Sequence, residues 1–277
     1  MLVAPAIAEV RRWRTTAPAP VGLVPTMGAL HDGHLALVAA ARDQCAAVVV
    51  SVFVNPLQFG PSEDLAHYPR DLPGDLDKLR RARVDAVFVP SVAAFVPPDM
   101  TTTVSVGGVT ETLEGAVRPG HFVGVATIVS KLLHVVTPDV AFFGEKDYQQ
   151  LVTIGRLVTD LDMPVRVAGV PIVRAADGLA LSSRNVYLSP GERARALALP
   201  SALRRVADGW IGDADGARGM LRSLLSSADG VALDYADVVD EHTLQPLHGT
   251  GNREARAVAA VRVGRTRLID NWKLEKR

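Results

Sequence analysis

The chain has 277 residues, of which 48% are hydrophobic and 22% are charged. This is the composition of a globular protein, and it excludes a disordered chain. The 30 Lys and Arg residues balance 30 Asp and Glu residues. A chain without a positive excess is poorly suited to hold a phosphate backbone, so we expect no nucleic-acid partner. Lysine is scarce among the basic residues, with five in all: Lys78, Lys131, Lys146, Lys273 and Lys276.

The cysteine content and the apolar runs bear on the compartment. The single Cys45 excludes an internal disulfide and agrees with a reducing environment. Near the N-terminus the arginines follow the apolar residues, which is the wrong order for a signal peptide. The longest apolar run, residues 45–54, is about half as long as a membrane crossing. We therefore expect a cytoplasmic protein with no membrane segment.

Short β-branched runs alternate with helix-length periodic segments through the first 175 residues. This alternation predicts a Rossmann-like, doubly wound α/β domain with a parallel sheet over residues 1–175. Ligands of such sheets bind beyond the carboxyl ends of the strands. The predicted strands are residues 21–24, 47–54, 85–90, 140–143 and 165–173, and the predicted helices are residues 35–43, 72–83, 125–136 and 148–160.

The pattern changes after residues 174–178. Ser189 and Glu192 have the spacing of a capping box, and Pro190 occupies the first helical position. Helices followed by a run of strands predict a smaller C-terminal α+β domain over residues 176–277. Its predicted helices are residues 190–208 and 215–227, and its predicted strands are residues 233–239, 257–263 and 266–270.

Residues 25–34, Pro-Thr-Met-Gly-Ala-Leu-His-Asp-Gly-His, lie between a predicted strand and the helix that follows it. A helix start offers unpaired N–H groups and partial positive charge, and Gly28 and Gly33 allow close approach of a ligand. His31 and His34 can share one helix face and stabilise charge that develops on a phosphate. A zinc pair or two surface histidines are the alternatives. With one cysteine and no clustered third ligand, we predict no metal site built from protein side chains.

Two common phosphate-binding motifs are absent. A Walker A loop requires Gly-Lys followed by Ser or Thr, and the sequence contains no Gly-Lys pair. A dinucleotide fingerprint would follow the first predicted strand, where Gly28-Ala29-Leu30 does not fit it. Both classes of nucleotide-binding protein are excluded.

Three further segments carry polar side chains after strands or near the predicted domain junction. Gly144-Glu145-Lys146-Asp147 offers a lysine for phosphate, or is simply a charged loop with a capping aspartate. Residues 181–185, Leu-Ser-Ser-Arg-Asn, could close over a triphosphate or form a solvated turn. Residues 55–59, Asn-Pro-Leu-Gln-Phe, suit a small polyol acid or an ordinary strand-ending turn.

These four segments occur in the order seen in the pantothenate synthetase (pantoate–β-alanine ligase) family. Two further segments also resemble that family: Arg-Pro-Gly-His-Phe at residues 118–122 and Thr-Arg-Leu-Ile-Asp-Asn at residues 266–271. The chain resembles this family of HxGH nucleotidyltransferases over nearly its whole length. The resemblance implies an ATP-dependent ligase that acts in two steps. Pantoate attacks the α-phosphate of ATP to form pantoyl adenylate and release pyrophosphate, and β-alanine then displaces AMP to give pantothenate.

The resemblance also implies roles for individual residues. His34 would donate a proton, His31 would assist on the phosphates, and Lys146 and Arg184 would draw charge from them. Gln58 and Gln150 would hold pantoate, and Gln58 is a candidate contact for β-alanine as well. The implied ATP-binding residues are Met27, Gly28, Ala29, Leu30, His31, Asp32, Gly33, His34, Gly144, Glu145, Lys146, Asp147, Val173, Leu181, Ser182, Ser183 and Arg184.

The remaining expectations concern the cation, the assembly and competing functions. The resemblance implies that Mg²⁺ accompanies ATP through its phosphate oxygens and that the protein is a homodimer. Related enzymes often carry Met where this chain has Leu181, and the similar volume predicts little effect. Lys78 is expected on a solvated helix face, and Lys273 and Lys276 in the tail. Two alternatives remain: a nucleotidyltransferase for another small acid, and a nucleotide-binding module without turnover. Measuring pyrophosphate release from ATP with each candidate acid would distinguish them.

Overall fold

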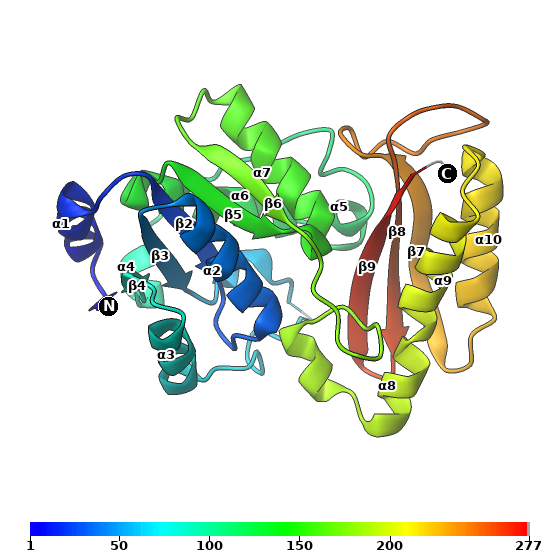
Figure 1. Ribbon diagram of the computed structural model, residues 1–277, viewed down its shortest axis with the longest axis horizontal. Helices are drawn as coiled ribbons and strands as arrows, with labels where there is room; N and C mark the ends of the chain where they lie inside the picture. Colours follow the sequence, from blue (N-terminus) through cyan, green and yellow to red (C-terminus); the bar gives the residue numbers. More distant parts are fainter. Residues whose placement is uncertain (62, 276–277) are drawn as a thin grey trace. The chain divides into compact units, whose positions relative to one another are not determined.

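A computed structural model of the chain describes residues 1–61 and 63–275 (Figure 1). The chain divides into two compact units. The larger unit comprises Met1–Glu145 and Gln149–Pro171, and the smaller comprises Lys146–Tyr148 and Ile172–Arg277. The short segment Lys146–Tyr148 therefore belongs with residues far along the chain. The separate roles expected for residues 1–175 and 176–277 stay a prediction.

The larger unit contains a six-stranded sheet in the order β1-β4-β3-β2-β5-β6, and each neighbouring pair is parallel (Figure 1). This confirms the predicted doubly wound α/β fold. The long apolar runs form central strands because both faces of those strands are covered. The strands are β1 (Leu2–Ala4), β2 (Val21–Thr26), β3 (Ala47–Val52), β4 (Ala86–Phe88), β5 (Val140–Gly144) and β6 (Arg166–Val170).

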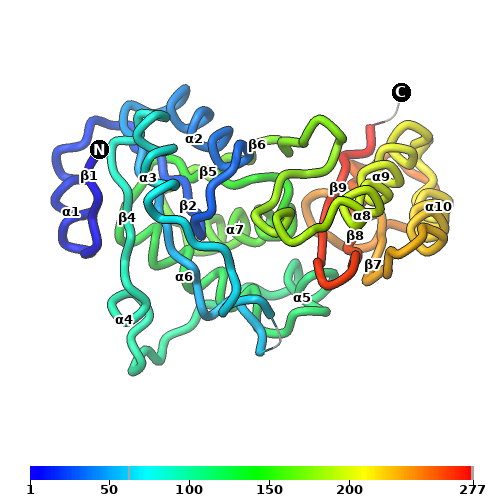
Figure 2. Tube along the Cα trace, turned by 90° about the horizontal axis from the view of Figure 1, so that it is seen from below, coloured from blue at the N-terminus to red at the C-terminus, as the bar shows by residue number. Residues whose placement is uncertain are grey.

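Helices cover both faces of this sheet (Figure 2). Because side chains alternate along a strand, Leu23 of β2 packs on the face that α1, α6 and α7 cover, and Val24 packs on the face that α2 and α3 cover. Two separate apolar cores result, one on each face. The helices are α1 (Ile7–Thr16), α2 (Asp32–Gln44), α3 (Leu72–Arg81), α4 (Val92–Phe95), α5 (Glu114–Val117), α6 (His121–Val136) and α7 (Tyr148–Asp160), with short 3₁₀ turns η1 (Pro56–Gln58) and η2 (Glu145–Asp147).

Some element boundaries differ from the expected ones. Strand β1 and helix α1 were not predicted. Strand β1 was missed because a strand of three residues shows too little alternation and is defined by its pairing with β4. Helix α6 begins at His121, after Gly120 at a φ of 81°. Strand β6 ends at Val170, and Pro171 has no N–H with which to continue the ladder.

The smaller unit contains an antiparallel sheet in the order β7-β8-β9, with one face packed against helices (Figure 1). This confirms the predicted α+β character of the C-terminal part. Its elements are η3 (Ser183–Tyr187), α8 (Pro190–Ala196), α9 (Ala198–Asp208), α10 (Ala214–Ser226), β7 (Val231–Asp240), β8 (Ala255–Val263) and β9 (Thr266–Leu274). Lys273 lies in β9, so the expectation that it lies in a tail was wrong, and Lys276 is outside the described residues.

The capping box that was predicted at Ser189 is present. The Ser189 Oγ accepts from the N–H of Glu192 at 3.3 Å, and the Glu192 carboxylate accepts from the N–H of Ser189 at 2.9 Å. The single helix expected after it is two helices, α8 and α9, separated at Leu197. Pro200 cannot donate to the carbonyl of Ala196, which removes one of the bonds that would join the two helices.

Candidate active site

Three of the four polar segments begin at the same edge of the parallel sheet. Strand β2 lies between β3 and β5, and all three run in the same direction. The turn at residues 27–31 follows β2, residues 53–59 follow β3, and Gly144 ends β5. Carboxyl ends of neighbouring parallel strands are where doubly wound folds bind their ligands. The larger unit therefore has its candidate site at this edge.

The turn after β2 is held by a buried carboxylate. Gly28 and Ala29 have positive φ angles of 82° and 49°, and a Cβ on Gly28 would lie 3.0 Å from Asp75 Oδ2. Asp75, on α3, accepts from the N–H of Ala29 at 2.8 Å and of Leu30 at 2.7 Å. Burial raises the pKa of Asp75, and the backbone N–H groups of Leu30 and Ala29 oppose that shift. The backbone of the turn is thus fixed by a residue distant in sequence.

Lys78, also on α3, takes part in the same anchor. Its Nζ donates to the carbonyl of Leu30 at 2.7 Å and lies 4.0 Å from Asp75 Oδ1. Lys78 lies on a helix with its side chain 41% exposed, as expected, but its ammonium group also binds the turn, which was not predicted. Sequence reasoning missed Asp75 as well, since an acidic residue in the first turn of a helix is explained equally well by the helix dipole.

His31 and His34 cap helix α2. The Nδ1 of His31 accepts from the N–H of Gly33 at 3.2 Å, and the Nδ1 of His34 accepts from the N–H of His31 at 3.3 Å. The two rings are 4.1 Å apart between centroids. Because each Nδ1 accepts a backbone hydrogen bond, the N–H of each ring is at Nε2. Both rings are thereby fixed at a helix N-terminus, where negative charge is favoured.

Gln58 lies against the turn after β2. Its Nε2 donates to Met27 Sδ at 3.2 Å, and its Oε1 accepts from the side chain of Asn55 at 3.0 Å. Asn55 is buried and also donates to the carbonyl of Gly124 on α6 at 3.1 Å. A Cβ on Gly124 would lie 2.2 Å from the carbonyl oxygen of Leu57, so α6 packs directly on η1. The structure thus brings Gln58 and Met27 together.

An ion-pair cluster supports the backbone of Gln58. Arg118 binds both carboxylate oxygens of Glu63, at 2.8 and 2.7 Å, and its Nη1 lies 3.0 Å from His121 Nε2. The Nδ1 of His121 lies 2.9 Å from the carbonyl oxygen of Gln58. Burial, with the charge of Arg118, lowers the pKa of His121 to about 4. His121 is therefore neutral at pH 7 and donates from Nδ1 to Gln58, a contact that sequence reasoning left without a role.

The other predicted glutamine, Gln150, lies half-buried on α7. Its neighbour Gln149 is fully buried and bonds to the N–H of Glu114 at 2.9 Å and to the carbonyls of Val109 and Thr112, both at 2.8 Å. Gln149 therefore holds the start of α5, whereas the side chain of Gln150 makes no hydrogen bond within residues 1–61 and 63–275. Within those residues, no hydrogen bond links Gln150 to Gln58.

Gly144 and Glu145 belong to the larger unit, and the predicted residues from Lys146 onward other than Gln150 belong to the smaller unit. Lys146 lies in η2, with its Nζ 3.8 Å from Asp147 Oδ1. Leu181 donates its N–H to the carbonyl of Val173 at 3.0 Å, so these residues are brought together in a hairpin. Ser182 caps η3 by accepting from the N–H of Arg184 at 3.3 Å, and Ser183 is buried. Ser182 therefore has a local structural contact, and the role of both serines at the nucleotide stays a prediction.

Metal-binding clusters and membrane-spanning helices are absent from the part of the chain that the structure describes. Within residues 1–61 and 63–275, no group of three His, Cys, Asp or Glu side chains could hold a metal ion. None of the helices in this part of the chain is long and apolar enough to cross a membrane.

The parallel sheet and the histidine-capped turn after its central strand define a doubly wound α/β protein. In this class of fold, ligands bind at the carboxyl edge of the sheet, where the polar loops lie. The family model described as pantoate–β-alanine ligase matches residues 3–273. A pantothenate synthetase of Rhizorhabdus wittichii is 52% identical over 269 residues, covering 96% of this chain and 95% of the relative. One of Roseiflexus is 49% identical over 278 residues, covering 99% and 100%.

Solved structures agree. The crystal structure of pantothenate synthetase from Thermus thermophilus has a TM-score of 0.94 at 48% identity, with all of both chains covered. That of pantoate–β-alanine ligase from Francisella tularensis, complexed with β,γ-ATP and β-alanine, has a TM-score of 0.83 at 33% identity, covering 100% of this chain and 99% of that one. The chain belongs to the pantoate–β-alanine ligase family. It is a ligase that condenses pantoate with β-alanine by forming a carbon–nitrogen bond, and the predicted enzyme class is confirmed.

Proposed function

We propose that the chain drives this condensation with ATP, through pantoyl adenylate, and that the turn after β2 binds the nucleotide. A carboxylate oxygen of pantoate attacks the α-phosphorus, and the bond to the bridging oxygen breaks so that pyrophosphate leaves. The amine of β-alanine then attacks the acyl carbon, the bond from that carbon to AMP breaks, and the attacking nitrogen loses a proton. The observation that carries the proposal is the pair of imidazoles fixed at the start of α2.

The residues of the turn would bind the phosphates and stabilise their charge. Met27 to His34 follow a strand and open a helix, whose unpaired N–H groups favour an anion. His34 would donate from Nε2 as charge develops on the leaving pyrophosphate, and His31 would assist on the phosphates. The anchor on Asp75 supports this role because it holds the turn rigidly before the nucleotide binds.

Two cationic side chains from the smaller unit would act on the same phosphates. Lys146 would draw charge from them, with Gly144, Glu145 and Asp147 completing that segment. Arg184 would act beside it, with Val173, Leu181, Ser182 and Ser183 completing the nucleotide contacts. Arg is suited to this task because its planar guanidinium can bind two phosphate oxygens at once. The hydrogen bond between Leu181 and Val173 supports a shared role for the second group.

Gln58 and Gln150 would hold pantoate, and Gln58 would also reach β-alanine. The amide of Gln58 is oriented by Asn55, while its Nε2 bonds to the sulfur of Met27. A thioether is a weak acceptor. Because of that, the N–H can move to a pantoate oxygen at little cost.

The cation, the assembly and the compartment remain proposals. The resemblance implies that Mg²⁺ would accompany ATP and be held mainly by phosphate oxygens. The ion would supply charge neutralisation on the phosphates. A homodimer and a cytoplasmic location are expected from the resemblance and the reducing compartment that the single cysteine indicates.

Pyrophosphate release tests the proposed order of steps. We expect the protein to release pyrophosphate from ATP when pantoate is added and before β-alanine is present. Lys146→Ala should lower that rate at least about tenfold, which corresponds to roughly 1.4 kcal/mol of barrier. Lys131→Ala is the matched control, since Lys131 contacts Met100 and the Phe95 ring. Release that requires β-alanine would refute the adenylate step, and an unchanged rate in Lys146→Ala would refute the role of Lys146.

A further inference from the structure

Asp270 and Asn271, adjacent residues of β9, have no role in the function proposed above. Both side chains are buried, and each bonds to a segment that carries proposed nucleotide ligands. We propose that Asp270 and Asn271 are positioning residues for the adenylation step: Asn271 sets the place of Lys146, and Asp270 sets the hairpin that leads to Arg184. This inference rests on the proposed roles of Lys146 and Arg184.

Asn271 binds the backbone of Lys146 directly. Its Nδ2 donates to the carbonyl oxygen of Lys146 at 3.1 Å. Its Oδ1 accepts from Arg256 Nη1 at 2.7 Å, which fixes the orientation of the amide, because an arginine can only donate. Turning the amide over would place two donors face to face. Asn271 is therefore held in the one orientation in which it can bind Lys146.

Arg256 holds the other end of the same segment. It is 5% exposed, and its Nε and Nη2 donate to Glu241 Oε1 at 3.1 and 2.7 Å. Its guanidinium lies 3.7 Å from the centroid of the Tyr148 ring, and the Tyr148 hydroxyl donates to the carbonyl of Glu241 at 3.2 Å. The segment Lys146–Tyr148 is thus fixed at both ends by residues of the C-terminal sheet and the turn after β7, which explains why it belongs to the smaller unit.

Asp270 fixes the second segment through Arg174. Its carboxylate accepts from Arg174 Nη1 at 2.7 Å and from Nη2 at 3.0 Å, and the guanidinium lies 4.6 Å from the Trp272 ring. Arg174 pairs with Ala180 across the hairpin, and its Nη1 also donates to the carbonyl of Gly178 at 3.2 Å. Holding Arg174 therefore shapes the hairpin, and Leu181–Arg184 follow directly from it.

The two contacts come from neighbouring positions on one strand. Successive side chains of a strand point to opposite faces, so Asp270 and Asn271 can hold two different segments at a constant separation. Strand β9 is paired with β8 along its whole length, which makes it a rigid support. Groups that act on a transferring phosphoryl group must be placed within a fraction of an ångström. A strand that positions both cationic segments meets that requirement.

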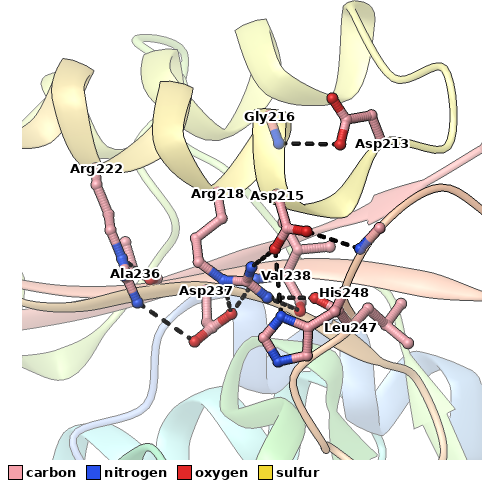
Figure 3. Close-up of polar contacts among 11 residues, drawn as sticks. Asp213, Asp215, Gly216, Arg218, Arg222, Ala236, Asp237, Val238, Leu247 and His248 are labelled. Carbon is pink, nitrogen blue, oxygen red and sulfur yellow. Dashed lines mark hydrogen bonds and ion pairs between the residues drawn. The ribbon is translucent and has the colours of Figure 1, made fainter.

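A comparable cluster in the same unit provides the control. Arg218 of α10 is 8% exposed and binds Asp237 Oδ1 at 2.5 Å and Asp215 Oδ1 at 2.6 Å (Figure 3). Its other partners are the carbonyls of Val238 and Leu247, so it contacts none of the proposed nucleotide ligands. Asp237→Asn should lower stability without lowering the adenylation rate.

The experiment measures pantoate-dependent pyrophosphate release and urea unfolding for a set of variants of the full chain. Asn271→Asp keeps the acceptor for Arg256 and removes the N–H that binds Lys146, and Asn271→Ala removes both. We expect each to lower kcat at least tenfold. In the Lys146→Ala background the same changes should lower kcat less than twofold further, since Asn271 acts through the ammonium group that is then missing. Asp270→Asn should lower kcat/KM for ATP at least fivefold, while Asp237→Asn keeps the wild-type value.

The outcomes separate this inference from the function on which it rests. A slow Lys146→Ala enzyme together with a wild-type rate in a folded Asn271→Asp protein would overturn the positioning role alone. A loss of equal size in both backgrounds would also overturn it, because a general loss of structure does not depend on Lys146. A wild-type rate in Lys146→Ala would overturn the proposed role of Lys146 and the inference with it. If Asn271→Ala does not fold, Asn271→Asp carries the test.

Discussion

Asp75→Asn tests whether a buried carboxylate holds the turn that carries the histidine pair. In the wild type, the two carboxylate oxygens accept from the N–H groups of Ala29 and Leu30 at 2.8 and 2.7 Å. An amide has a single oxygen, so one of these N–H groups must lose its acceptor and face an NH₂ group. The shape of the side chain hardly changes, and the perturbation is therefore confined to hydrogen bonding and charge.

The size of the effect follows from two opposing contributions. An unsatisfied buried donor costs about 1–3 kcal/mol. Losing the charge offsets part of that cost, since burial raises the pKa of Asp75 and so penalises the ionised form. We expect the free energy of unfolding to fall by about 2 kcal/mol. A loosened turn should also raise KM for ATP at least about fivefold, which is roughly 1 kcal/mol.

Urea unfolding and initial-rate kinetics measure the two effects. Asp77→Asn is the matched control on the same helix, because the Asp77 side chain is 63% exposed and pairs with Arg80. An exposed pair of this kind contributes at most about 1 kcal/mol. If Asp75→Asn had the stability and KM of the wild type, the two N–H groups would be satisfied without the carboxylate, and the anchoring argument would be wrong.

Two further predictions concern the support of Gln58. Gly124→Ala should destabilise the protein by about 1–3 kcal/mol in urea unfolding and raise KM for pantoate, because the added Cβ would lie 2.2 Å from the carbonyl oxygen of Leu57. Gly155→Ala is the control, because a Cβ at that position would meet nothing within 4 Å. His121 has a pKa of about 4 in place of 6.5, so the unfolded chain takes up the proton first as the pH falls. Lowering the pH from 7 to 5 should therefore cost the wild type about 2 kcal/mol of unfolding free energy from this group. His121→Gln should lack that part of the loss, and an unchanged pH dependence would contradict the burial argument.

Much of the fold was predictable because its signals are local. The continuous apolar run that became β3 requires cover on both faces, and α7 begins and ends where its periodicity predicted. The capping box at Ser189 was found where its spacing indicated. The break between α8 and α9 was not predicted, although Pro200 was a visible signal for it. The candidate residues His31, His34, Lys146 and Gln58 were recognised because each lies in a short motif that follows a strand.

The sequence by itself determined the layered α/β class, the order of the polar segments and the family, because periodicity and motif spacing are properties of neighbouring residues. The tertiary structure alone decided which distant residues hold those segments in place. Asp75 and Asn271 look unremarkable in the sequence, as an acid near a helix start and an amide in a strand. Each acquires its role from a backbone N–H or carbonyl more than 40 residues away, at 2.7–3.1 Å. No local pattern encodes such a contact, since it exists only once the strands and helices have packed.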